Sequence, residues 1–407
     1  MVKNNKFLKD NLYLLVGTGF LSVSGFFFHF FMGRSLGPED YGVLASVMAV
    51  MALIGIFIST LQLSISKFVA SFKIKKKIEE LNYLFSATFK KLNKLFFILW
   101  LLFLGVNIFL SSFLEINYWF LFMASFVLLI TPSIAITRGF MQGLQNFRIY
   151  GICLSMEGFF KLFLGIGLVL LGFGVGGVIA AIVLSYFIAV VYAIKMVKKS
   201  VGSSLKKFES KEIYHYTLPV FFTVLFFTAF YSFDLLLVKH FFPAVDAGNY
   251  AVVSLLGKII FFASFSIIQV MYPKVVELSE NGGRHKDVLL KSFLVTLAFS
   301  LPLLTVYYFF GGLVVNLLFG SQYLGVVNLI APYGLFMLFV SLSKMFSLYL
   351  LSFKKYLFLY LFGFFLILEI VLLSLFHASL TQVVNILLSL GFLFTSLMGY
   401  LVVRFKE

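Results

Sequence analysis

Uncharged stretches of about 20 residues recur along the whole chain and restrict its fold more than any other feature. An apolar helix of this length crosses a hydrocarbon core of about 30 Å. Lipid offers the backbone no hydrogen-bond partners, so only helices and closed barrels span it. The sequence lacks the short alternating segments of a barrel. We therefore expect an all-α polytopic membrane protein.

Composition supports this expectation and excludes other classes of protein. Hydrophobic residues make up 61% of the chain and charged residues 12%, whereas soluble proteins carry roughly 25% charged residues. No P-loop, CxxC or HExxH motif is present, so we expect neither an enzyme, nor a catalytic residue, nor a bound metal. We predict twelve spans, at residues 11–33, 41–66, 94–114, 117–137, 149–172, 175–194, 215–238, 247–272, 292–313, 325–351, 356–376 and 380–402.

The net charge of +16 is explained by membrane topology. The termini and the loops on one side of the predicted spans hold 27 of the 32 Lys and Arg, and the loops on the other side hold two. Basic residues gather on the cytoplasmic side of membrane proteins. We therefore expect a multi-pass protein of the cell membrane with both termini in the cytoplasm. The bilayer, and not nucleic acid, is the partner that this charge indicates.

The two halves of the chain resemble each other. The hydrophilic connection at 195–215 separates six predicted spans from six. An acidic turn with Pro and Gly follows the first span of each half, and Tyr41-Gly42 and Tyr250-Ala251 follow those turns. Because both halves start on the same side, the repeat is parallel and should form two lobes around a central cavity. We predict lobes at 1–200 and 201–407.

Three segments carry a family resemblance. LGPEDYGVLASVMAVMALIG begins at Leu36, TRGFMQGLQNFRIY begins at Thr137, and FDLLLVKHFFPAVDAGNY begins at Phe233. Their order and spacing resemble the polysaccharide-transporter branch of the MOP superfamily. That superfamily includes multidrug (MATE) exporters, Wzx-type flippases of lipid-linked oligosaccharides and the lipid II flippase.

The resemblance implies a MATE-like fold and a flippase. Such a protein moves a polyprenyl-diphosphate-linked oligosaccharide from the cytoplasmic to the outer leaflet. The substrate carries a diphosphate, a glycan and an isoprenoid chain, so it requires a hydrophilic, cation-lined cavity between the lobes. Ionisable residues within the spans are therefore candidates for function.

Four candidates lie in the first half of the chain. Glu157 and Lys161 are spaced i, i+4, which places them on one helical face. They either form a local ion pair that faces the cavity without touching the substrate, or act there directly, Lys161 in substrate binding and Glu157 in ion coupling. Arg138 and Arg148 flank a predicted cytoplasmic turn. They either contact the diphosphate or anchor the topology.

Four further candidates lie in the second half. Asp234 either binds a coupling cation or proton, or holds helices together. Lys258 either pairs with Asp234 or contacts phosphate. Glu369 occupies a place in the eleventh span comparable to that of Glu157. Lys344 either reaches the cavity or extends to the inner headgroups.

Several alternatives stay open on the sequence. A MATE-like ion-coupled multidrug exporter shares the fold, and a membrane glycosyltransferase has little support because the outer loops are short. We expect no cofactor, and the driving force is either a coupling Na⁺ or H⁺ or the substrate gradient. A polysaccharide polymerase and glycosyltransferases are the protein partners that the resemblance suggests.

Overall fold

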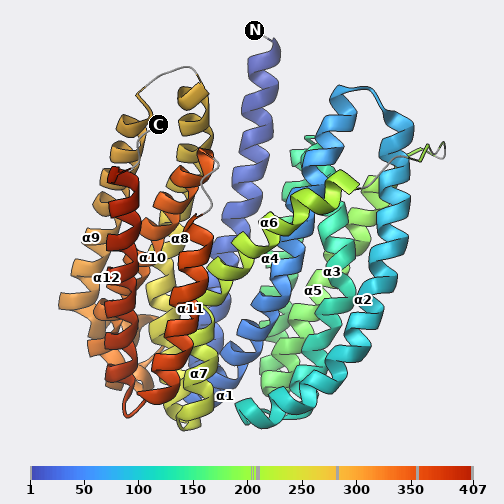
Figure 1. Cartoon of the computed structure of the whole chain (residues 1–407). Coiled ribbons are helices and arrows are strands. Elements are labelled where there is room, and N and C mark those ends of the chain that lie inside the picture. Colours follow the sequence, from blue (N-terminus) through green and yellow to red (C-terminus); the bar gives the residue numbers. More distant parts are fainter. Residues whose placement is uncertain are drawn as a thin grey trace. The chain divides into compact units, whose positions relative to one another are not determined.

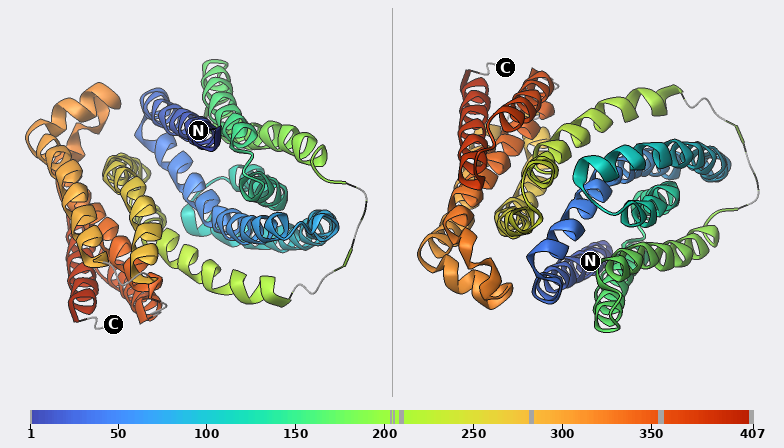
Figure 2. Two further views of the ribbon diagram at one scale, coloured as in Figure 1. Left: turned by 90° about the horizontal axis from the view of Figure 1, so that it is seen from above. Right: turned by 90° about the horizontal axis from the view of Figure 1, so that it is seen from below.

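The fold is all-helical over the part of the chain that the structure describes. A computed structural model describes residues 2–202, 204, 206–207, 211–280, 284–353 and 357–404. Within each unit most of the helices lie side by side with their axes roughly aligned (Figures 1 and 2). The helices are α1 (Val2–Ile74), α2 (Ile78–Leu114), α3 (Tyr118–Gly143), α4 (Phe147–Leu170), α5 (Gly174–Lys198), α6 (Lys211–Phe230), α7 (Phe233–Phe241), α8 (Ala244–Glu280), α9 (His285–Leu318), η1 (Ser321–Val326), α10 (Val327–Ser352), α11 (Leu357–Leu375) and α12 (Leu380–Arg404).

The prediction of about twelve membrane-spanning helices is confirmed. Among the described residues, ten helices are long and apolar enough to cross a membrane, and the bent pair α6 and α7 makes eleven. Helix α1 contains two of the predicted spans, one on each side of a kink. The predicted seventh span is broken, because its two parts, Val220–Phe230 and Phe233–Phe241, meet at 42°.

The kink in α1 lies at the turn that the Gly-Pro-acid cluster predicts. Gly37 has a φ of 77°, which is the left-handed region that a residue without Cβ adopts at little cost. Pro38 then begins the second part of the helix, where its missing N–H costs nothing. We call Gly37–Gly42 the elbow.

Contacts divide the chain into two compact units. Unit 1 comprises Met1–Leu36 and Val43–Thr228, and unit 2 comprises Gly37–Gly42 and Ala229–Glu407. The elbow thus belongs to unit 2, while the helical segments on both sides of it belong to unit 1. These units describe packing, so the sequence-repeat boundary near residue 200 stays a prediction.

One helix lies at the centre of each unit. In unit 1, α3 packs on α2 and α5. In unit 2, α10 packs on α8, α9 and α12. These central helices are the fourth predicted span of each half, so corresponding spans occupy corresponding places.

The elbow is held in unit 2 by aromatic packing and by contact between backbones. Tyr41 is 1% exposed, and its ring lies 6.2 Å from that of Phe319 and 6.4 Å from that of Tyr323. A Cβ on Gly248 of α8 would overlap the backbone carbonyl of Pro38. Glycine at this position therefore allows α8 to contact the elbow through its main chain.

Candidate functional site

A buried ion pair crosses the interior of unit 1. Arg138 on α3 donates a hydrogen bond from Nη2 to Oε2 of Glu157 on α4. The side chains are 15% and 8% exposed, respectively. A buried charge is stable only when it is paired and hydrogen-bonded, so each member of this pair depends on the other.

Polar side chains from three helices form a hydrogen-bond network beside the pair. Gln62 Nε2 on α1 donates to Gln142 Oε1 on α3 over 3.1 Å and to Tyr150 Oη on α4 over 3.0 Å. Tyr150 is also close enough to Arg138 to interact electrostatically. These bonds join α1, α3 and α4 inside the unit. The sequence analysis missed Gln62 and Gln142, whose spacing along the chain gives no signal.

The local pair predicted between Glu157 and Lys161 is wrong, because Glu157 is bound to Arg138. The Lys161 ammonium instead lies 5.2 Å from the centroid of the Phe28 ring on α1. Arg presents a planar fork of donors that matches a carboxylate better than an ammonium does. The i, i+4 rule describes pairs on exposed helices, whereas Glu157 is buried and pairs with a residue of another helix.

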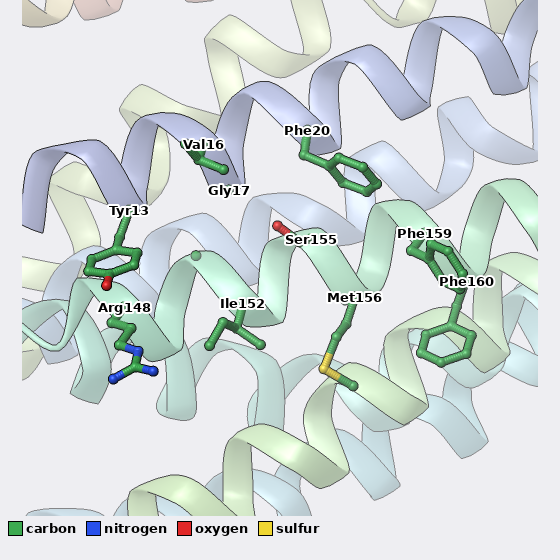
Figure 3. A pocket seen from close by; sticks show the side chains of 11 residues that line it. Tyr13, Val16, Gly17, Phe20, Arg148, Ile152, Ser155, Met156, Phe159 and Phe160 are labelled. Atoms are coloured by element: carbon green, nitrogen blue, oxygen red, sulfur yellow. The ribbon is translucent and has the colours of Figure 1, made fainter. Parts of the chain in front are cut away.

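Arg148 differs from Arg138, although both flank the same turn. It lies in the first turn of α4 and is exposed. Its guanidinium lies 5.9 Å from the centroid of the Tyr13 ring on α1 (Figure 3). Among the described residues it forms no ion pair. Arg148 is therefore free to meet an anion, whereas Arg138 is occupied by Glu157.

A buried carboxylate lies in the interior of unit 2. Asp234 is in the first turn of α7, directly after the break in the seventh span, and is 0% exposed. Its Oδ2 accepts hydrogen bonds from Tyr250 Oη over 2.8 Å and from Tyr333 Oη over 2.6 Å. Ser254 Oγ lies 3.1 Å from Tyr333 Oη. The tyrosines come from α8 and α10, so Asp234 joins three helices.

Carboxylate oxygens without partners lie in the same region. Asp234 Oδ1 and both carboxylate oxygens of Glu369 are buried with no hydrogen-bond partner among the described residues. Glu369 on α11 is 0% exposed and close enough to Asp234 for electrostatic repulsion. Two buried carboxylates repel each other when both are charged, and a proton or a cation relieves this repulsion.

The two candidate lysines of unit 2, Lys258 and Lys344, lie on a pair of packed aromatic rings. Lys258 on α8 is 5.8 Å from the ring centroid of Tyr231, and Lys344 on α10 is 4.9 Å from that of Phe261. The two rings are 5.2 Å apart. Aromatic faces attract cations without neutralising them. Lys258 is electrostatically attracted to Asp234, but no ion pair joins the two side chains among the described residues.

The described residues contain no group of three or more acidic, His or Cys side chains that could hold a metal ion. The helices, the buried ionisable groups and the interior cations define a multi-pass membrane protein of the transporter type. Comparison with solved structures shows which fold these helices form. The chain is 12% identical to the inward-facing conformation of a multidrug resistance MATE family transporter of the MOP superfamily. The match covers 97% of this chain and 100% of that chain, with a TM-score of 0.79.

Two other solved structures share the fold. The lipid II flippase MurJ in an inward closed conformation is 14% identical, with 97% of this chain and 88% of that chain covered and a TM-score of 0.77. A MOP superfamily transporter from Pyrococcus furiosus is 16% identical, with 97% and 95% covered and a TM-score of 0.62. At these identities the likeness shows the fold alone, which is the MATE-like fold of the MOP superfamily.

The family is shown by sequence. The profile of the polysaccharide biosynthesis protein family matches residues 31–328, so the chain belongs to that family. A search of curated protein sequences found no match. The resemblance noted from the three sequence segments is thereby confirmed.

Proposed function

We propose that the chain is a flippase that moves a polyprenyl-diphosphate-linked oligosaccharide from the cytoplasmic to the outer leaflet of the cell membrane. The main support for an anionic substrate is Lys258, which lies in a membrane helix against Tyr231 and has no ion pair among the described residues. An interior cation without a carboxylate partner is costly in a membrane unless it serves an anion. Membership of the polysaccharide biosynthesis family supports a glycan-linked anion.

The basic residues take different roles in this proposal. Arg148 contacts the diphosphate at the cytoplasmic surface, where its guanidinium can bind two oxygens. Lys258 and Lys344 attract the phosphates as point charges during passage. Lys161, on the face of Phe28, is the corresponding cation of unit 1. Arg138 and Glu157, in contrast, stabilise unit 1 through their ion pair.

The driving force enters the proposal at Asp234 and Glu369. Their three unpartnered buried oxygens can take up a coupling Na⁺ or be neutralised by H⁺. Either ion relieves the repulsion between the two acids and favours the packing of α7 against α11. A gradient of that ion can therefore bias one conformation.

A liposome assay tests the proposal. A short fluorescent polyprenyl-diphosphate sugar is placed in both leaflets, and its protection from an external quencher is followed with and without a Na⁺ or pH gradient. We expect protein-dependent exchange between leaflets. Lys258→Gln and Lys344→Gln should slow exchange without loss of folded protein, and Asp234→Asn should remove the response to the gradient.

The assay also separates the alternatives. The MATE-like exporter predicts no exchange of the lipid probe, together with gradient-driven efflux of a cationic dye. Normal exchange by both lysine variants would contradict the interior cation site. If the rate of exchange is the same with and without a Na⁺ or pH gradient, the substrate gradient is left as the driving force.

A further inference from the structure

A groove lies between α1 and α4 in unit 1, with a volume of about 330 Å³ (Figure 3). Arg148 and Tyr13 lie at one end of it. Toward the other end, Phe20 comes from α1 and Phe159 from α4. At 1.5 Å per residue, the distance from Arg148 to Phe159 along α4 is about 16 Å, or half of a hydrocarbon core.

Glycines make this groove possible. A Cβ on Gly151 would overlap the backbone carbonyl of Tyr13, and a Cβ on Gly17 would meet the backbone of Gly151. The two helices therefore touch through their main chains, and no side chains fill the space beside the contact. Two further glycines, Gly158 and Gly165, follow at seven-residue intervals on α4 and also face α1.

The walls of the groove are apolar and open. Val16 is 61% exposed, Phe20 40%, Ile152 38% and Phe159 44%. In a membrane protein such side chains border lipid, and they offer a long, narrow apolar surface. Arg148 is the charged group at the end of this surface, and its guanidinium lies against the ring of Tyr13. The groove therefore fits an amphiphile with an anionic head and an apolar tail.

We propose that this groove holds the isoprenoid chain of the lipid-linked substrate, with the diphosphate at Arg148. The proposal rests on the proposed function and adds to it a binding site for the tail. One groove and one cation match a lipid with a single chain, whereas a phospholipid has two chains. The tail then stays in the groove between α1 and α4 while the polar head is transferred.

A photolabelling experiment tests the site. The probe is a polyprenyl diphosphate with a diazirine at the far end of its isoprenoid chain, added to the full-length protein in liposomes of phosphatidylcholine and phosphatidylglycerol. We expect labelled peptides from α1 and α4. Unlabelled polyprenyl diphosphate should compete with the label, and additional phosphatidylglycerol should not.

Two groove-filling variants have a matched control. Val16→Trp and Ile152→Trp place an indole in the groove and should reduce labelling about tenfold or more. Val191→Trp makes the same change on α5 at a residue that is 50% exposed, and should leave labelling unchanged. Two separate variants guard against a folding defect in either one, and thermal unfolding reports whether each is folded.

The head of the lipid is tested at Arg148. Arg148→Gln should lower labelling, and Arg148→Lys should restore part of it because the charge is kept. Arg404→Gln is the matched control, since the Arg404 guanidinium also lies on a tyrosine ring, that of Tyr400, at 4.8 Å. Equal loss with Arg404→Gln would contradict a specific role for Arg148.

The outcomes separate this proposal from the proposed function. Leaflet exchange of the head with labels elsewhere in the chain would overturn the groove and leave the flippase intact. Equal competition by phosphatidylglycerol would also overturn it, because the groove would then take membrane lipid in general. Groove labelling without exchange would support the site and contradict the flippase. Neither labelling nor exchange would overturn both.

Discussion

Removing the charge of Glu157 should destabilise unit 1 strongly. Glu157→Gln leaves the Arg138 guanidinium, which is 15% exposed, without a counter-ion. Breaking a buried pair in this way costs about 3–5 kcal/mol. For a unit of this size each kcal/mol lowers the melting temperature by about 2–4 °C, so we expect a decrease of about 6–20 °C.

Intrinsic fluorescence can follow this change in unit 1. The chain contains two tryptophans, and both Trp100 and Trp119 belong to unit 1. Thermal unfolding of the detergent-purified protein, monitored by tryptophan emission, therefore reports on the unit that contains the ion pair. Glu115→Gln is the control, because Glu115 is an exposed acid at the end of α2 and should change stability by less than about 0.5 kcal/mol.

A double-mutant cycle tests the physical reasoning. Arg138→Gln alone should also destabilise, because Glu157 then keeps a buried charge. The double variant carries two neutral amides that can bond to each other, and it should be more stable than the sum of the single effects predicts, by about 1–3 kcal/mol. Additive single effects, or a Glu157→Gln variant that melts with the wild type, would refute the coupling.

Two further predictions concern unit 2, and both are measured as thermal stability of the purified variants. Gly248→Ala should destabilise the protein by about 1–3 kcal/mol, because the added Cβ would overlap the backbone of the elbow. Gly312→Ala is the control: its Cβ would meet no atom within 4 Å, so the variant should gain up to about 1 kcal/mol of helix propensity. Equal effects of the two substitutions would contradict the close contact at Gly248. Tyr333→Phe removes a hydrogen bond to the carboxylate of Asp234 and should cost about 1.5–3 kcal/mol. Tyr307→Phe removes a bond to a neutral backbone carbonyl and should cost about 1 kcal/mol. Equal losses at the two tyrosines would indicate that Asp234 is neutral in the folded protein.

The membrane class and the helix plan could be predicted because lipid restricts the backbone so strongly. Each predicted span overlaps a helix along most of its length, or, for the seventh span, the bent pair α6 and α7, and the turn predicted from Gly37 and Pro38 is the kink in α1. Apolar length and glycine geometry are local properties, and neither depends on what the segment packs against. The candidate ionisable residues could be chosen for the same reason, since a charge in a span is visible without coordinates.

The partners of those residues could not be predicted. The i, i+4 spacing indicates Lys161 as the partner of Glu157, yet Arg138 from another helix binds it. Asp234 similarly bonds two tyrosines and not Lys258. Such pairs depend on which helix faces are brought together, and this depends on packing across the whole unit.

The sequence by itself determined that the chain spans a membrane many times, that the first helix turns at Gly37 and Pro38, and which side chains carry charge into the apolar interior. Those properties follow from local hydrophobicity and from the conformational freedom of single residues. Only the tertiary structure decided that Arg138 is occupied while Arg148 is open, and that α1 and α4 enclose a groove beside Gly17 and Gly151. Both depend on the approach of helices distant in sequence, because an ion pair and a groove exist only between surfaces that meet.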